Sequence, residues 1–268
     1  MKYFVSDLIV GMGGIRDFGA WVSSVGRPDF GAEFSAFTHS ESYWKELAET
    51  VVPACTAPMT FHGPYVRIEA TAPLDSPEHA FLMASYEKVM DLAAAYGARH
   101  IVFHYSQLHF PREALPEAQK NAMAVMEALT AMAREKGVHL VIENLCRHPK
   151  EGEHLFTNEE YFALFEKMPL AESLIDIGHA NVNGLDIEKF LALYGSRVRG
   201  FHVHNNDGVS DQHRDYHNGT ADIRSIMRWA GNYTNDADIV IEYEPHEHLT
   251  HAELLEEIDE LKSWAEGK

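Results

Sequence analysis

The sequence has little cysteine, few basic residues and no long apolar run. Its two cysteines, Cys55 and Cys146, lie far apart among 268 residues and match neither a disulfide framework nor a thiolate metal motif. No apolar stretch reaches the roughly 18 to 20 residues that a membrane-spanning helix needs. An acid at Asp7 interrupts the apolar start too early for a signal peptide. A cytoplasmic protein without a membrane-spanning segment is therefore expected.

Acidic residues outnumber basic ones, because 22 Lys and Arg face 41 Asp and Glu, for a net charge of −19. Such a surface repels phosphate backbones, so the composition disfavours nucleic acid as a partner and favours a small-molecule substrate. No linker, low-complexity tract or charge block divides the chain. Apolar residues make up 46% of it, enough for one sizeable core, and a single domain over residues 1–268 is expected.

Short β-rich apolar runs alternate with longer stretches of helical periodicity, a pattern typical of βαβ units and a parallel sheet. Eight runs are predicted as strands: 4–10, 31–35, 59–62, 100–104, 139–143, 174–176, 200–204 and 239–242. Eight units in 268 residues give about 34 residues per unit, which suits a barrel of roughly 250 residues. The predicted fold class is α/β, with a single (β/α)8 TIM barrel.

The predicted helices carry their own start and stop signals. Thr157 and Thr250 begin capping boxes, each completed by a glutamate three residues later. Gly97, Gly137 and Gly195 follow apolar-periodic runs and are predicted to end helices. These signals separate the predicted strands from the helices that cover them.

A potential metal ligand stands at the end of six consecutive predicted strands. These residues are His62, His104, Glu143, Asp176, His204 and Glu242. The ends of parallel strands that close into a ring meet at one mouth, where the active sites of such barrels lie. Three histidines and three carboxylates without a counter-ion would repel one another, whereas a divalent cation neutralises carboxylates and accepts imidazole lone pairs. The sequence therefore predicts a divalent-metal site.

Further polar residues lie close to these strand ends. His179 stands three residues beyond the sixth predicted strand, and Asp211 and His213 stand in the loop after the seventh. Loops at this end line the mouth, so all three are additional candidates. On the seventh predicted strand, His202 and His204 point to the same side of the sheet. His204 completes its apolar run as the other candidates do and is predicted to be the ligand, with His202 one layer deeper.

These motifs together resemble the xylose-isomerase-like barrels, a superfamily of sugar isomerases and epimerases that also contains abasic-site nucleases of the endonuclease IV type. The resemblance runs from about Glu33 to Glu242. The ordered set that carries it is His62-Gly63-Pro64-Tyr65, Ile101-Val102-Phe103-His104, Val141-Ile142-Glu143-Asn144, Asp176-Ile177-Gly178-His179, His202-Val203-His204-Asn205-Asn206-Asp207, Asp211-Gln212-His213 and Ile241-Glu242.

The isomerase and epimerase branch implies one catalytic divalent metal, held at the positions of Glu143, Asp176, His204 and Glu242. In that branch, Glu143 and Glu242 match the pair that exchanges a proton with the substrate carbon, one on each face of a metal-stabilised enediolate. The implied activity is the isomerisation or epimerisation of a sugar or a sugar phosphate.

Two other functions remain open. The nuclease branch implies three zinc ions shared among nine positions, and this sequence fills them with His62, His104, Glu143, Asp176, His179, His204, Asp211, His213 and Glu242. The acidic composition favours the sugar enzyme over such a zinc-dependent phosphodiester hydrolase. The third alternative is a non-catalytic, metal-bearing barrel that binds a sugar. Mixed histidine and carboxylate ligands without thiolate suit manganese, cobalt or zinc in each case.

Three residues are predicted to contact the substrate. Arg147 and His217 closely follow ligand-bearing strands, and Glu33 lies on the second predicted strand. The identity of the sugar depends on loop contacts a few ångströms from the metal, which the motifs do not specify. Barrels of the resembling family often pair, so a homodimer is one open alternative.

Overall fold

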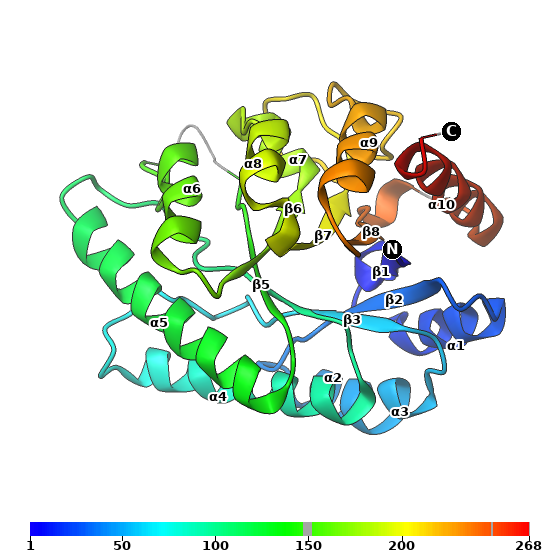
Figure 1. The fold of residues 1–268 in the computed structure, drawn as a ribbon. Coiled ribbons are helices and arrows are strands. Elements are labelled where there is room, and N and C mark those ends of the chain that lie inside the picture. The colour runs from blue at the N-terminus through cyan, green and yellow to red at the C-terminus, as the bar shows by residue number, and fades with distance from the viewer. Residues whose placement is uncertain (147–151, 248, 268) are drawn as a thin grey trace.

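Eight parallel strands form a closed ring in sequence order, with β8 returning to β1 (Figure 1). The computed structural model describes residues 1–146, 152–247 and 249–267. The strands are β1 Tyr3–Ser6, β2 Phe30–Ser35, β3 Met59–His62, β4 Ile101–Phe103, β5 Leu140–Glu143, β6 Glu172–Asp176, β7 Val198–Val203 and β8 Asp238–Ile241. Helices surround the ring, which confirms the predicted (β/α)8 TIM barrel.

The first strand is shorter than predicted. A strand over residues 4–10 was expected, but β1 ends at Ser6 and a 3₁₀ turn follows over Asp7–Val10. The Ser6 side chain accepts a hydrogen bond from the Leu8 amide, which starts the turn, and Gly11 ends it with φ 62°. The other seven strands lie within two residues of their predicted bounds. A local side-chain cap therefore overrides the strand preference of the apolar run after Asp7.

Ten helices, counted over the described residues, cover the outside of the ring. They are α1 Ile15–Val25, α2 Glu41–Glu46, α3 Val52–Ala54, α4 Pro77–Tyr96, α5 Leu115–Lys136, α6 Asn158–Lys167, α7 Ile177–Asn183, α8 Ile187–Tyr194, α9 Ile223–Tyr233 and α10 His251–Ala265. The capping boxes at Thr157 and Thr250 start α6 and α10 as predicted. Gly97 and Gly137 end α4 and α5 in the left-handed conformation. Gly195 ends α8 at φ −54°, and a Cβ there would lie 2.4 Å from the carbonyl oxygen that ends α9.

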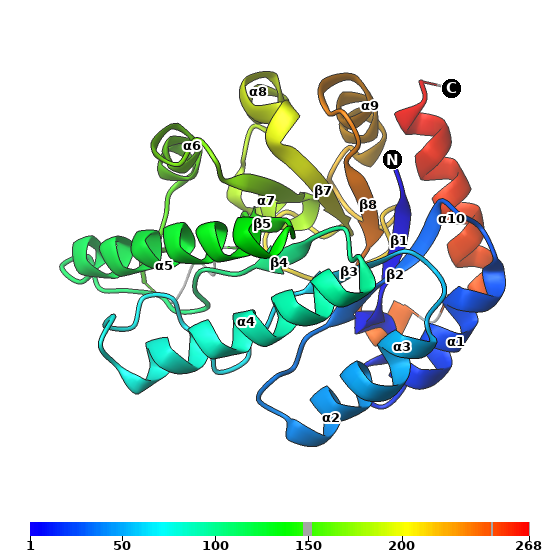
Figure 2. The same ribbon diagram turned by 60° about the horizontal axis from the view of Figure 1, so that its bottom comes forward.

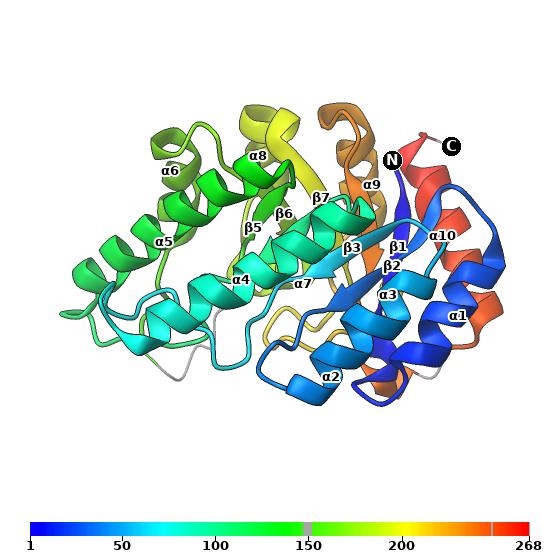
Figure 3. The same ribbon diagram turned by 90° about the horizontal axis from the view of Figure 1, so that it is seen from below.

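The helices form a continuous layer outside the strands, in which the last helix, α10, lies next to the first, α1. Figure 2 shows α4 and α5 side by side outside the strands β3 to β5. The last helix, α10, packs beside α9 and reaches α1 (Figure 3). Trp21 of α1 and His251 of α10 stack there, with ring centroids 3.9 Å apart. Within the described ranges, no helix has the length and apolar character that crossing a membrane requires.

The apolar core has two parts. The larger part lies between the strands and the helices, and a small cluster of Val102, Val141 and Leu174 lies inside the ring. That cluster comes from the neighbouring strands β4, β5 and β6. Buried polar residues come from the other strands and from the residue before β4: Glu33, Thr60, His100, His202 and Asp238. Barrel interiors are usually filled by branched apolar side chains, so this polar half is a distinctive feature.

Candidate metal centre

The nine side chains predicted as metal ligands lie at the end of the barrel where the strands finish. His62, Glu143 and Asp176 are the last residues of β3, β5 and β6, while His104 and Glu242 directly follow β4 and β8. Of the others, His204 directly follows β7, His179 lies in α7, and Asp211 and His213 lie in the loop before α9. The nine fall into overlapping groups in which the ligand atoms lie within 4.8 Å of one another. The ring geometry thus brings together residues from six βα units.

The first group consists of His62, His104 and Glu143. The Nδ1 atom of His62 lies 3.0 Å from the Gly63 carbonyl oxygen, so a proton on Nδ1 leaves a lone pair on Nε2. That Nε2 is 3.2 Å from His104 Nε2, which in turn lies 2.6 Å from Glu143 Oε2. Two imidazole nitrogens and a carboxylate oxygen therefore converge, as they do around a metal ion.

The second group is arranged around the carboxylate of Asp211. His179 and His213 lie 2.9 and 3.0 Å, through Nδ1, from the backbone carbonyl oxygens of Asn144 and Glu242. Their Nε2 atoms point to the same Asp211 Oδ2, at 3.1 and 3.3 Å. Backbone carbonyls that fix the Nδ1 side of an imidazole are the usual support for a ligating Nε2. His213 also adopts φ 42°, a strained backbone conformation of the kind that collects at functional sites.

The third group lies deeper and centres on His202. Its Nδ1 is 3.1 Å from Glu242 Oε2 and 3.3 Å from Glu143 Oε1. The same nitrogen is 3.7 Å from Asp176 Oδ2. His204, the predicted ligand, lies 3.0 Å through Nε2 from Asp176 Oδ2 and forms a group with Asp176 and Glu242. His202, predicted to lie one layer deeper, is therefore the histidine that faces all three carboxylates.

The sequence pointed to His204 because this residue ends the apolar run, and the strand register shows where that run lies relative to Asp176. Asp176 at the end of β6 pairs with His202 on β7, so these two residues share a level of the barrel. A register irregularity between Ser173 and Leu174 shifts the two strands relative to each other. The apolar run of β7 therefore ends beyond the level of Asp176, and His204 lies two residues past the partner of Asp176, His202.

Opposite charges shift the pKa values of the buried groups. Burial acts to raise the pKa of Glu143, but the imidazoles of His104 and His202 hold it well below its usual range. Burial acts the same way on Glu242, and His202 is the main cause of its lowered pKa. Burial acts to lower the pKa of His202, yet Glu242, Glu33 and Glu143 raise it well above its usual value. Both glutamates therefore stay ionised, and a bound cation would replace imidazole protons as their counter-charge.

The donor set fits a divalent metal. The buried side-chain atoms without a hydrogen-bond partner, among the described residues, include His204 Nδ1 and Asp211 Oδ1 in this cluster and His202 Nε2 beneath it. Leaving a buried polar atom unpaired costs roughly 1–3 kcal/mol, which ligation would recover. Imidazole nitrogens and carboxylate oxygens are ligands that zinc, manganese and cobalt accept.

A cavity of about 190 Å³ opens over this centre. Its lining includes seven of the nine candidate ligands together with Ser35, Tyr65 and Gln107. A second cavity of about 340 Å³ adjoins it and shares His104 and Gln107. Ser35, Tyr65 and Gln107 are thus placed to contact a ligand, although the sequence motifs singled out none of them. Tyr65 ends the motif that begins at His62, which was the available signal.

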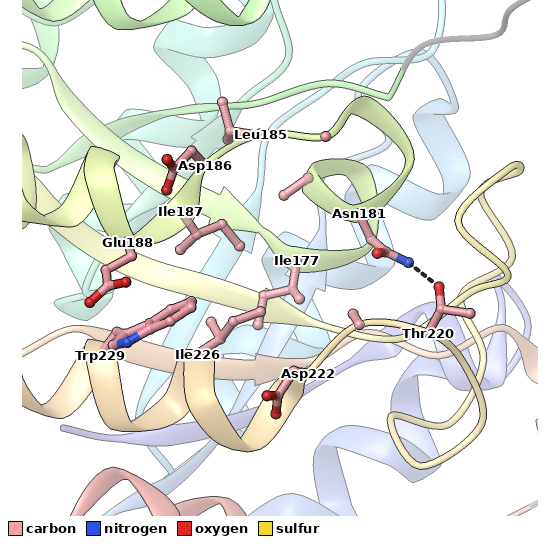
Figure 4. Close-up of a pocket in the computed structure, with 13 residues that line it drawn as sticks. Ile177, Asn181, Leu185, Asp186, Ile187, Glu188, Thr220, Asp222, Ile226 and Trp229 are labelled. Carbon is pink, nitrogen blue, oxygen red and sulfur yellow. Dashed lines mark hydrogen bonds between the residues drawn. The ribbon is translucent and has the colours of Figure 1, made fainter.

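A larger cavity of about 390 Å³ lies outside the ring, against α7, α8 and α9 (Figure 4). Ile177, Ile226 and Trp229 form part of its wall, and Asn181 donates a hydrogen bond to Thr220 Oγ1 across its edge at 2.8 Å. The described residues that line it include none of the nine candidate ligands. The candidate site is therefore placed at the barrel mouth, where the candidate ligands lie, although the outer cavity is larger.

Two of the three predicted substrate contacts, Glu33 and His217, do not line the cavity over the candidate metal centre. Glu33 is 0% exposed, inside the barrel beneath the metal centre, because inward-facing residues alternate along β2 and Ser35 occupies the level of the mouth. His217 is 52% exposed and pairs with Glu260 of α10 at 3.1 Å, on the outer side of the barrel. Arg147 lies outside the described residues. The structure thus moves Glu33 and His217 away from the cavity over the metal centre.

Gly178 allows α7 to lie against the metal centre. A Cβ at this position would lie 2.0 Å from His204 Cε1, so one of the two residues must move. We expect Gly178→Ala to displace His204 and to weaken zinc binding by about tenfold, as loss of a supporting contact does at other metal sites. A titration against a competing chelator measures this. Gly13→Ala is the matched control, because its Cβ meets nothing within 4 Å. Unchanged zinc affinity in Gly178→Ala would contradict the expectation.

Comparison with known proteins identifies the family. Residues 24–264 match the model of the xylose isomerase-like TIM barrels, and the chain belongs to that family. No curated protein sequence matches the chain.

Solved structures share the fold at low sequence identity. A D-tagatose 3-epimerase-like protein is 18% identical with a TM-score of 0.77, over 99% of this chain and 97% of its own. The IOLI protein, solved with a zinc atom, is 15% identical with a TM-score of 0.75, over 99% and 98% of the two chains. D-allulose 3-epimerase from Methylomonas sp., in complex with D-allulose, is 19% identical with a TM-score of 0.67, over 91% and 84%. At such identities the likeness shows the fold alone.

Proposed function

We propose that this protein is a metal-dependent isomerase or epimerase of a sugar. The observation that carries the proposal is the placement of two ionised glutamates around one small cavity. Glu143 and Glu242 both lie within 3.3 Å of His202 Nδ1, and both line the cavity of about 190 Å³. A general base must lie within hydrogen-bond reach of the proton that it abstracts. Two carboxylates beside one cavity suit a reaction in which a proton is removed from a substrate carbon and a proton is then returned to that carbon.

Glu143, Asp176, His202 and Glu242 would hold the metal. When bound, a divalent cation stabilises the negative charge that develops on substrate oxygens and makes the adjacent C–H more acidic. The protein residues perform the proton transfer. One glutamate, ionised, takes the proton from the substrate carbon, and the second, which has first taken a proton from solvent, delivers it to the opposite face in an epimerisation. The lowered pKa values of both groups leave them ionised before substrate binds.

The names of structural neighbours agree with this proposal. Two of the similar structures are a D-tagatose 3-epimerase-like protein and a D-allulose 3-epimerase in complex with its sugar. A third, the IOLI protein, carries a zinc atom.

Solvent exchange at carbon tests the proposal. The metal-loaded protein is incubated with free ketohexoses in deuterated water, and NMR follows the loss of the C–H signal and the appearance of a second sugar. Incorporation of deuterium at carbon is the expected result, because the abstracted proton exchanges with solvent. A protein that binds metal and sugar but incorporates no deuterium would instead be a non-catalytic binding barrel.

We expect the substrate to be an uncharged sugar rather than a sugar phosphate. The described residues that line the two adjoining cavities include no Lys or Arg, while Glu244 adds a carboxylate to the four acidic candidate ligands nearby. A phosphate dianion needs cationic partners, usually arginine or lysine. The measured kcat/KM for a free ketohexose should exceed that for its phosphate ester by about a hundredfold, given roughly 1.4 kcal/mol for each factor of ten. A preference for the ester would contradict the expectation.

A zinc-dependent phosphodiester hydrolase is the second candidate function. The specific observation in its favour is that all nine side chains of the three-zinc pattern converge in this fold. The formal charge of −19 and the absence of Lys and Arg from the described cavity lining oppose it. Incubation of the zinc-loaded protein with an abasic oligonucleotide separates the two, because strand scission would favour the hydrolase and an intact strand the sugar enzyme.

A further inference from the structure

A chain of buried polar side chains crosses the barrel interior beneath the metal centre. At its outer end, Arg99 Nε donates to Asp238 Oδ1 at 2.7 Å, and its Nη2 donates to Asp236 at 2.8 Å. Asp238 Oδ2 lies 3.2 Å from His100 Nδ1. Asp238 and His100 are each only 1% exposed. The ion pair between Arg99 and Asp238 at the base of the barrel is therefore linked, through His100, to polar groups in the interior.

Glu33 joins this chain to the metal centre. Its Oε2 accepts a hydrogen bond from Thr60 Oγ1 at 3.1 Å and lies 3.9 Å from His100 Nε2. Its Oε1 lies 3.0 Å from His202 Nε2, and among the described residues neither of these two buried atoms has a hydrogen-bond partner, so the contact is one of charge and proximity. His202 turns its other ring nitrogen, Nδ1, to the carboxylates of the metal centre. The imidazole of His202 is therefore held between one carboxylate below and a group of carboxylates above.

We propose that Glu33 is a positioning residue for metal binding, which holds the proton of His202 on Nε2 so that the Nδ1 lone pair faces the ion. This inference rests on the proposed function, in which His202 is a ligand. A neutral imidazole carries its proton on one nitrogen and its lone pair on the other. A carboxylate beside Nε2 selects the tautomer that can bind a cation through Nδ1.

The location of Glu33 argues for such a role. A carboxylate inside a barrel is costly to bury unless it is paired, and an apolar side chain of similar volume would fill the space at lower cost. The opposite half of the same interior is filled in that way by Val102, Val141 and Leu174. Carboxylate partners of ligating histidines commonly raise metal affinity by about 10-fold to 100-fold. Metal binding therefore gives a physical reason for keeping charge at this position.

Zinc affinity of folded variants tests the role of Glu33. The full-length chain and its variants Glu33→Leu, Glu33→Gln and Thr60→Val are stripped of metal, checked for folding by circular dichroism, and titrated with zinc against a competing chelator. We expect Glu33→Leu to raise the Kd for zinc by at least about tenfold. The zinc Kd of Glu33→Gln should lie between those of the wild type and Glu33→Leu, because its amide oxygen can still accept a hydrogen bond from His202 Nε2–H. Thr60→Val leaves the carboxylate in place and should bind nearly as the wild type does.

The visible spectrum of bound Co²⁺ provides a second measurement, which would not change if Glu33 had a purely structural role. The visible absorption of bound Co²⁺ should change in Glu33→Leu and be partly restored in Glu33→Gln. Equal zinc Kd values for the wild type and a folded Glu33→Leu would overturn the role of Glu33 alone, and an equal loss in Thr60→Val would overturn it as well. If Glu33→Leu does not fold, Glu33→Gln decides by the same criterion. A wild-type chain that binds neither ion would overturn the proposed function itself.

Discussion

Replacing Glu143 or Glu242 with glutamine is expected to lower kcat by about 10²-fold to 10⁴-fold, the contribution that general acid–base catalysis usually makes. Glutamine keeps the shape of each side chain but accepts no proton from carbon. Because the proposed reaction needs one glutamate to take a proton and the other to return one, each single variant should lose epimerisation. Turnover and deuterium incorporation, measured on the same metal-loaded samples, provide the readout.

The control for these variants is Glu188→Gln, which removes a carboxylate from the outer cavity against α8 and α9. It should retain wild-type turnover. Metal content must be measured for Glu143→Gln and Glu242→Gln, since both residues are also candidate ligands. Near-wild-type activity in either variant would exclude that glutamate from proton transfer.

Removal of the metal is expected to destabilise the protein by about 4 kcal/mol when the ion is present at a thousand times its Kd. For a domain of this size that loss corresponds to a fall in Tm of roughly 10 °C. The physical cause is the concentration of buried carboxylates at the mouth, which repel one another without a cation. Thermal unfolding with and without a strong chelator measures the effect.

Asp176→Asn isolates the metal contribution from the local fold. Asp176 caps α7 by accepting a hydrogen bond from the His179 amide at 2.6 Å, and asparagine caps helices equally well. The variant should therefore keep α7 while losing metal and the stabilisation that the metal provides. Elemental analysis of the chelator-free protein also counts the ions. About one per chain would favour the isomerase or epimerase, and two to three zinc ions would favour the hydrolase. A chain without any metal and with unchanged Tm after chelation would contradict the prediction.

The fold and the membership of the candidate centre could be predicted because they follow from repetition. Each of the last six βα units places one polar residue after its apolar run, and a closed ring must bring such residues together whatever the details of packing. His62, His104 and Glu143 come from separate units, yet their ligand atoms meet within 4.8 Å. The prediction that these residues meet therefore still holds when each strand end is predicted wrongly by one or two residues.

Details that depend on the pairing of neighbouring strands were not predictable in the same way. The irregularity between Ser173 and Leu174 changes the register of β7, and it brings His202 rather than His204 to the level of Asp176. Local sequence carries no clear mark of such a shift. Glu33 was predicted to contact the substrate, but its level along β2 places it inside the barrel.

The contact between Arg99 and Asp238 spans 139 residues of sequence and joins the first half of the barrel to the second. Neither half could satisfy its buried charges alone, because Arg99, His100 and Glu33 come from one half while Asp238 and His202 come from the other. An isolated half-barrel would leave these groups unpaired in an apolar environment, which is costly. Ring closure and charge pairing must therefore occur together during folding. The chain should fold as one cooperative and comparatively slow unit rather than by docking two preformed halves.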